Sequence, residues 1–401
     1  MSSLAVEEHT FQGQHIREYP GALAKSQEDA LMLHAKSYTP HEVKSGQCQG
    51  ELTNIAFHAN AFHKEVYEPF FDELYRTLKY KHGLTLSSIW IADQAAQGSS
   101  ARLNDGVLGN DPHWFDHSRD ILCMVNTFRA QMKRPIAAVG HSMGDPPKTL
   151  TFTRSYPAML KYTLSKPEAY PSREEAERAT RASPFFKTWD ERALKRYVET
   201  AWWEAPPAEG SERRLIKLKT SLGSEVRTIG RPNLDHIGEP ISDLQRYTHP
   251  DVTPDSPLTG PAYNPHTRAA YSDLESLRPP TLFVLGKGSQ ICPPNELEHR
   301  TSITGKAPGG SGGQSAGRVH SITIAGGHFL PMTNINGTAE ETARWLKVRI
   351  EGWRCCEAAF TKEWESTTIA ERQRLDHDLL RKWDGKPWDK GRTSTVVTAK
   401  L

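Results

Sequence analysis

The feature that most constrains this chain is a short turn at residues 140–144. Its sequence is Gly-His-Ser-Met-Gly, and it directly follows the apolar run Pro135–Val139. A short apolar run of this kind predicts a buried strand. The two glycines permit the tight backbone that lifts a serine side chain clear of the end of a strand. The segment therefore predicts a strand that ends in a nucleophile, Ser142.

The segments around this turn alternate between strand and helix patterns, although residues 1–50 are polar and show no clear periodicity. The predicted strands lie at 52–59, 87–93, 135–140, 279–286 and 319–328. The predicted helices lie at 63–78, 117–132 and 338–353. Such alternation implies a parallel sheet with right-handed crossovers. With the serine turn, it predicts the fold class α/β: an α/β-hydrolase fold with a mostly parallel central sheet and an inserted helical cap.

Composition divides the chain further. Residues 168–275 are rich in Glu, Lys, Arg and Pro, and we interpret them as a helical cap inserted into a hydrolase core. The core then comprises residues 1–167 and 276–353, and residues 354–401 form a charged helical extension. A run of glycine and serine at 307–317 predicts a flexible surface loop.

Charge and cysteine content exclude several classes of protein. The chain has 50 Lys and Arg against 48 Asp and Glu, a net charge of +2, which is too balanced for a nucleic-acid binder. No apolar run reaches the roughly 20 residues of a transmembrane segment. The five cysteines lack metal-ligand spacing, and their odd number and scatter suit a reducing compartment. We expect no metal and no cofactor.

Two further segments supply the groups that a serine nucleophile needs. In this fold the loop after the first parallel strand, here His58–Glu65, provides one N–H of the oxyanion hole, and the residue after the nucleophile provides the other. We therefore predict the backbone N–H groups of Asn60 and Met143 in this role. The general base follows the last strand, and His328 has that place after two glycines. The prediction is a pair of Ser142 as nucleophile and His328 as base.

Six stretches are more specific than these single residues: HANAFHKEVYEP, WIADQAAQGSS, GNDPHWFDHSRD, GHSMG, YPSREEA and GGHFLPM. Together they resemble the fungal peroxisomal α/β-hydrolases of secondary-metabolite pathways. That group contains hydrolases of host-selective-toxin biosynthesis and is similar to mycophenolic acid acyl-CoA hydrolase. The resemblance covers most of residues 10–350. It implies a serine hydrolase of an acyl-CoA thioester, with Ser142 and His328 in the nucleophile and base positions.

The carboxylate of the triad is ambiguous, because the chain departs from the family pattern after the serine turn. The family's acid ends the strand after the elbow helix, but only 26 residues separate the turn from the Pro-Ser-Arg-Glu-Glu segment. In one alignment the helix and strand are deleted, and Asp145 is the acid. In the other nothing is deleted: Asp145 caps the helix, 148–155 is the helix, 159–165 is the strand, and Glu168 is the acid.

The two alignments rest on different arguments. Loss of a central strand would split the sheet, which favours Glu168, whereas the match to the start of the family's cap favours Asp145. The usual alternative acid position offers no carboxylate, since it is occupied by Lys287, Gly288, Ser289 and Gln290. We predict Asp145 as the acid, with Glu168 as the alternative.

The combined prediction is a serine hydrolase that cleaves an acyl-CoA thioester in a peroxisomal, toxin-type pathway. The alternatives are a carboxylesterase or lipase acting on a small ester, and an inactive α/β-hydrolase-fold protein that binds a ligand or partner. The chain ends in Ala399, Lys400 and Leu401, close to the peroxisomal signal Ser-Lys-Leu. We therefore expect the peroxisomal import receptor as a partner and the peroxisomal matrix as the location.

Overall fold

The structure is a computed structural model. It describes residues 2–142, 155–207, 210, 212–234, 241–252, 262–289, 291–292 and 294–374, with the backbone alone over 155–159. The chain divides into two compact units, Met1–Trp345 and Leu346–Leu401. The residues of the candidate site that are described all lie in the first unit.

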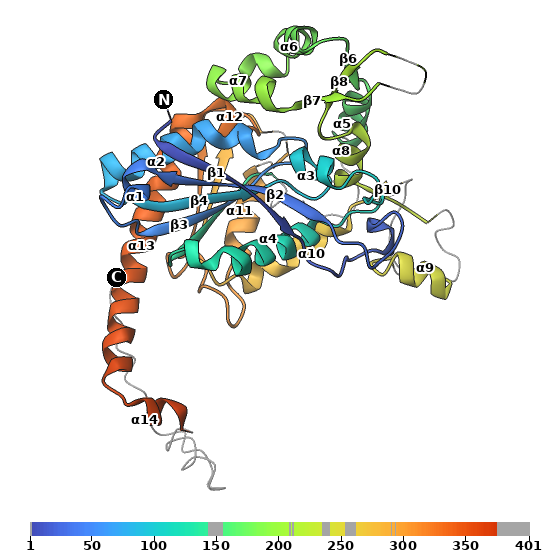
Figure 1. Cartoon of the computed structure of the whole chain (residues 1–401). Coiled ribbons are helices and arrows are strands. Elements are labelled where there is room, and N and C mark those ends of the chain that lie inside the picture. Colours follow the sequence, from blue (N-terminus) through green and yellow to red (C-terminus); the bar gives the residue numbers. More distant parts are fainter. Residues whose placement is uncertain are drawn as a thin grey trace. The chain divides into compact units, whose positions relative to one another are not determined.

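Five strands form the main sheet of the first unit, in the order β1-β2-β4-β3-β5 (Figure 1). Strand β3 is parallel to β4 and β5, and β2 is antiparallel to β1 and β4. The predicted alternation of strands and helices is thus confirmed from β3 to β5, and the sheet is mixed because β1 and β2 add antiparallel pairs. The bounds are β1 Leu4–Gln12, β2 Met32–Pro40, β3 Leu52–Phe57, β4 Leu86–Ala92 and β5 Ile136–Gly140.

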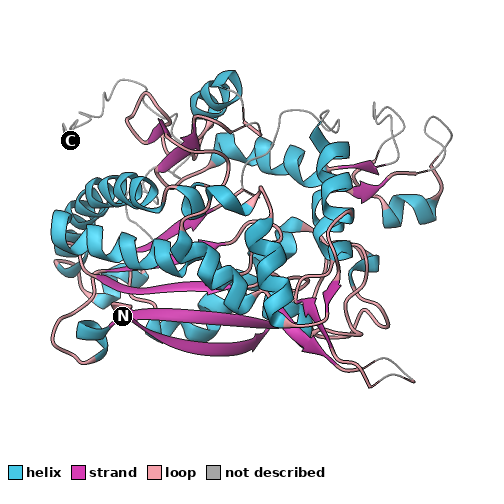
Figure 2. Ribbon diagram, turned by 90° about the horizontal axis from the view of Figure 1, so that it is seen from above, coloured by secondary structure: helices cyan, strands magenta, loops and turns pink. Residues whose placement is uncertain are grey.

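Helices α2 and α4 connect the parallel strands, as the sequence pattern predicts (Figure 1), and Figure 2 shows helices packed alongside the strands. On α2, Phe70, Leu74 and Leu78 recur every fourth residue and are all buried. The helix ends at Gly83, whose φ of 62° lies in the left-handed region that glycine adopts at low cost. The other connecting helices of this half are short. The bounds are α1 His41–Lys44, α2 Glu68–His82, α3 Gly98–Leu103 and α4 Trp114–Phe128.

The first fifty residues hold two strands that the sequence pattern did not reveal. Strand β2 is mostly buried, yet it carries Lys36, whose ammonium group forms ion pairs with Glu65 at 3.2 Å and with Glu8 at 3.1 Å. A buried charge with partners is tolerated inside a sheet, but it breaks the alternation of apolar and polar residues. The partners come from distant segments, so the local pattern could not show them.

The sheet is split. Strands β11 (Thr281–Gly286) and β12 (Val319–Ile324) form a separate parallel pair. Among the described strands, none is hydrogen-bonded to both β5 and β11. The apolar run of β5 predicts a buried strand, but no residue of β5 is fully buried. The alternative alignment placed a strand at 159–165. This is wrong, because helix α5 (Ser155–Leu164) covers nearly all of that segment.

The predicted cap region contains more than helices. Strands β6, β8 and β7 form a small antiparallel sheet in that order beside helices α6 and α7 (Figure 1). Its helices begin at side-chain caps, as Ser172 and Asp190 accept hydrogen bonds from the first turns of α6 and α7. The bounds are β6 Ala169–Tyr170, α6 Arg173–Ala182, α7 Glu191–Thr200, β7 Trp202–Ala205, β8 Leu215–Leu218, α8 Leu222–Ile229, β9 Arg231–Pro232, α9 Asp243–Thr248, β10 Ala262–Tyr263 and α10 Pro265–Asp273.

The glycine-rich segment 307–317 follows a defined path, contrary to the prediction of a flexible loop. Ala307 N–H donates to Glu275 C=O at 2.8 Å, and Ser311 N–H donates to Leu277 C=O at 3.0 Å. These bonds hold the segment against the chain that precedes β11. Glycine supplies the positive φ values that such consecutive turns need.

The C-terminal part of the described chain is helical. Helix α13 continues into the second unit, where Thr368 and Glu371 form a reciprocal capping box at the start of α14. None of the helices in the described ranges is long and apolar enough to cross a membrane. The remaining bounds are α11 Pro294–Ile303, α12 Leu330–Thr333, α13 Ile335–Glu365 and α14 Ile369–Gln373.

Candidate active site

Ser142 occupies a strained turn at the carboxyl end of β5. Its φ is 70°, in the left-handed region that residues other than glycine rarely adopt. The turn is anchored because the N–H of His141 donates to Phe57 C=O at 3.1 Å, which extends the pairing of β5 with β3. A serine held in this way is presented beyond the edge of the sheet.

His328 lies against this serine. Its Nε2 is 2.7 Å from Ser142 Oγ, a hydrogen bond between residues 186 positions apart in the chain. The structure therefore brings together the two residues that the sequence predicts as nucleophile and base. Burial lowers the pKa of His328 to about 4, so the imidazole is neutral at physiological pH and free to accept the serine proton.

The end of β11 holds the histidine loop in place. Gly288 N–H donates to Gly326 C=O at 2.8 Å, and Lys287 N–H donates to Ile324 C=O at 2.8 Å. The approach is so close that a Cβ at Gly286 would lie 2.1 Å from the Gly327 carbonyl oxygen. Only glycine fits at residue 286, so β11 positions the base although it contributes no acid.

Hydrogen bonds within the loop after β3 fix the orientation of the peptide between Ala59 and Asn60. The carbonyl of Ala59 accepts from His58 Nδ1 at 2.9 Å and from the N–H of Phe62 at 3.1 Å. This carbonyl and the Asn60 N–H belong to one planar trans peptide, so fixing the oxygen also fixes the direction of the N–H. Among the described residues the Asn60 N–H has no acceptor. An oxyanion-hole donor needs an N–H without a protein acceptor, and over the described ranges the Asn60 N–H meets this condition.

The Asn60 side chain faces the cap and a second loop. Its Nδ2 donates to Glu225 C=O at 2.8 Å, and its Oδ1 accepts from Gln97 Nε2 at 2.7 Å. Gln97 Oε1 also accepts from the N–H of Ala61 at 2.8 Å. Gln97 therefore binds both residues of this turn. Sequence reasoning missed it, because a lone glutamine in a loop carries no recognisable pattern.

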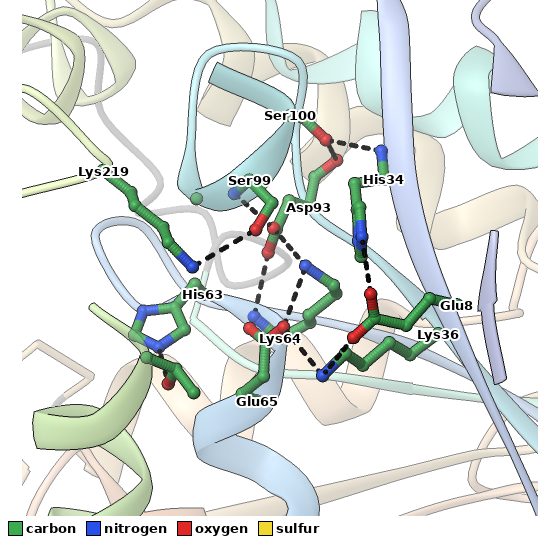
Figure 3. Close-up of polar contacts among 12 residues, drawn as sticks. Glu8, His34, Lys36, His63, Lys64, Glu65, Asp93, Ser99, Ser100 and Lys219 are labelled. Carbon is green, nitrogen blue, oxygen red and sulfur yellow. Dashed lines mark hydrogen bonds and ion pairs between the residues drawn. The ribbon is translucent and has the colours of Figure 1, made fainter. Parts of the chain in front are cut away.

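A buried ion cluster lies behind this loop (Figure 3). Asp93 directly follows β4 and accepts from Lys64 Nζ at 2.5 Å, from Lys64 N–H at 2.9 Å and from Ser99 N–H at 2.7 Å. Neither charged side chain is exposed at all. Burial alone would raise the pKa of Asp93, but the charge of Lys64 prevails and holds it below its ordinary value. A carboxylate directly after a buried strand was the signal that could have revealed this cluster.

Comparisons with known proteins show the family to which the chain belongs. No family model matches the chain. The type I acyl-CoA thioesterase mpaH of Penicillium roqueforti is 31% identical over 423 residues, which cover 94% of this chain and 93% of that protein. The enzyme of the same name from Penicillium brevicompactum is 31% identical over 405 residues, 89% of this chain and 91% of that protein. The chain belongs to the family of these thioesterases.

More distant similarity gives the fold of this family. The abhydrolase domain-containing protein AFT2-1 of Alternaria alternata is 24% identical over 266 residues, 60% of this chain and 95% of that protein. The solved structure of the peroxisomal alpha-beta-hydrolase Lpx1 from Saccharomyces cerevisiae has a TM-score of 0.63 at 14% identity, and covers 94% of this chain and 100% of its own. The protein is an α/β-hydrolase.

The site of this α/β-hydrolase has no described acid. In the described ranges no carboxylate acts on His328, and Glu168 is exposed in the bend before β6. Met143, Asp145, Ala399, Lys400 and Leu401 lie outside the described residues. The alignment with the P. roqueforti relative spans 423 residues, more than the 401 of this chain, so that relative carries residues with no counterpart here.

Aromatic rings from three distant segments meet beside Ser142 and His328. The ring of Phe329, next to His328, lies 5.3 Å from that of Phe62 and 5.1 Å from that of Phe185 between centroids. Phe62 belongs to the loop that contains Asn60, and Phe185 precedes helix α7, within the region predicted as a cap. These rings place apolar surface beside Ser142 and His328.

Proposed function

We propose that this α/β-hydrolase cleaves an acyl-CoA thioester through an acyl-enzyme at Ser142. One observation carries the proposal: Ser142, at a φ of 70°, bonds to a neutral histidine at 2.7 Å. A nucleophile and a base within hydrogen-bond reach are the minimum for covalent acyl transfer. The substrate class is supported by two relatives of 31% identity that are named acyl-CoA thioesterases.

The geometry supports a two-step reaction. His328 Nε2 takes the proton of Ser142 Oγ as the hydroxyl attacks the carbonyl carbon, and the Asn60 N–H stabilises the oxyanion together with the N–H of Met143. The thiolate of CoA leaves and takes up the proton held by His328. The neutral His328 then accepts a proton from the water that attacks the acyl-enzyme, and returns it to Ser142 Oγ as the acid is released. A base with a pKa lowered to about 4 suits this substrate, because a thiolate leaves with little help from a proton donor.

For the acid of the triad we propose Asp145. It directly follows the turn that bears Ser142, and the alternative, Glu168, is exposed. The test is a pair of isosteric variants, Asp145→Asn and Glu168→Gln. We expect Asp145→Asn to lower kcat by roughly 10²–10⁴-fold and Glu168→Gln to leave it within twofold. If Glu168→Gln lowers kcat by this amount and Asp145→Asn does not, Glu168 is the acid.

The decisive experiment for the function uses Ser142→Ala with an acyl-CoA series and a fluorophosphonate probe. We expect the natural chain to release CoA and to be labelled at Ser142, and the variant to do neither. Ser302→Ala is the matched control, since that hydroxyl on α11 is exposed and bonds only to His299 C=O at 2.7 Å. Labelling with hydrolysis of small esters alone would favour a carboxylesterase, and absence of labelling would favour the inactive ligand-binding protein.

We also propose that the protein is imported into the peroxisomal matrix through Ala399, Lys400 and Leu401. This tripeptide keeps the small, basic and leucine pattern of the receptor-read signal. The test is a fluorescent protein fused to the amino terminus, with and without Leu401. Punctate fluorescence that becomes diffuse on deletion supports the proposal, and an unchanged distribution contradicts it.

A further inference from the structure

We infer that Tyr67 and His141 are positioning residues. They fix the relative positions of three loops of the site, which contain Ala59, Ser142 and His328. Three hydrogen bonds connect these loops. Ala59 N–H donates to Tyr67 Oη at 2.8 Å, Tyr67 Oη lies 2.8 Å from His141 Nδ1, and His141 Nε2 lies 3.0 Å from the His328 carbonyl oxygen. The inference rests on the proposed function, in which Ser142 is the nucleophile, His328 the base and the Asn60 N–H an oxyanion donor.

The direction of every bond in this chain follows from the chemistry of its ends. The carbonyl of His328 can only accept, so His141 Nε2 must carry a proton. Burial lowers the pKa of His141 to about 3, so the ring is neutral and its Nδ1 accepts the hydroxyl proton of Tyr67. The Tyr67 oxygen then accepts from the N–H of Ala59. Each group has one role, and no other arrangement satisfies all three contacts.

The residues joined by these three hydrogen bonds are either next to, or the same as, the residues that we place in the reaction. Ala59 precedes Asn60, whose N–H we propose as an oxyanion donor. His141 precedes Ser142, and the bonded carbonyl belongs to His328 itself. A shift of Tyr67 or His141 therefore changes the distance between nucleophile, base and oxyanion donor at once. Both side chains are buried, so water cannot replace a lost partner at low cost.

The test compares Tyr67→Phe, His141→Leu and His141→Gln by the rate at which a fluorophosphonate labels Ser142 in the folded protein. We expect Tyr67→Phe and His141→Leu to label about 10- to 100-fold more slowly, because a displacement of about 1 Å between reacting groups has an effect of this size. His141→Gln offers an amide donor to the His328 carbonyl, and we expect it to recover part of the rate. A merely structural role would change the urea midpoint and leave the rate of the folded protein unchanged.

Tyr75→Phe is the matched control. Tyr75 lies on α2, is buried like Tyr67 and donates its hydroxyl proton to Glu42 at 3.0 Å, away from the three loops. We expect its labelling rate to stay within twofold. The inference is overturned if folded Tyr67→Phe and His141→Leu label as fast as Tyr75→Phe, or if the natural chain is not labelled at all. Labelling without CoA release would instead refute the thioesterase, and the variant rates would still decide the inference.

Discussion

Replacing Asp93 by asparagine should reveal how strongly the buried ion cluster supports the site. The carboxylate accepts three hydrogen bonds, two from backbone N–H groups and one from Lys64 Nζ at 2.5 Å. Asparagine keeps the shape but offers one acceptor oxygen, so donors that now face oxygen would face an NH₂ group. Lys64 would remain buried with Glu65, at 3.1 Å, as its remaining anion.

The expected loss of stability follows from the unpaired lysine. Removing one partner of a buried ion pair lowers the free energy of unfolding by about 3–5 kcal/mol, and we expect the lower end of this range because Glu65 remains. With a urea m-value of about 3 kcal/mol per M, the unfolding midpoint should fall by about 1 M. Asp93 also bonds to the N–H of Lys64, at the end of the loop that contains Asn60, so the labelling rate of Ser142 should fall as well.

The assay is urea unfolding followed by tryptophan fluorescence, with Glu8→Gln as the control. Glu8 forms an ion pair with Lys36 at 3.1 Å in the same cluster, but its side chain is 61% exposed. We expect the free energy of unfolding of this variant to fall by less than about 1 kcal/mol, because water screens the charges of an exposed ion pair. If the two variants shift the midpoint equally, burial does not set the strength of these pairs and the reasoning is refuted.

Three further predictions concern charge and proton binding. The double variant Lys64→Met/Asp93→Leu should unfold at a higher urea concentration than Asp93→Asn, since it leaves neither member of the pair alone; a lower midpoint would contradict this. With the pKa of His328 lowered to about 4, kcat/KM should stay level as the pH falls from 7 to about 5 and drop near 4; an acid limb at 6.5 would show that burial does not lower this pKa. Burial lowers the pKa of His117 to about 3, so the unfolded chain binds the extra proton and stability should fall as the pH drops from 6.5 toward 3. In urea unfolding at several pH values, His117→Phe should flatten that slope, and an unchanged slope would exclude His117 as its source.

The sequence by itself determined the elements and the nucleophilic turn. Apolar runs and helical spacing are local properties, and they predicted β3, β4, α2 and α4 because each buries its own apolar face. The same kind of run predicted β5, although none of its residues is fully buried. The glycines around Ser142 likewise predicted a strained turn from five residues. The same patterns could not show β1 and β2, whose buried charge on Lys36 is compensated by residues from other segments.

The tertiary structure decided which distant groups meet. Ser142 and His328 lie 186 positions apart and bond only because β5 and the loop after β12 place them at one site. The connection through Tyr67 and His141, and the close approach of Gly286 to the histidine loop, have no local signal, since each depends on atoms that folding brings together. The split of the sheet likewise follows from which strands pair, because a strand's own residues do not specify how many neighbours it will have.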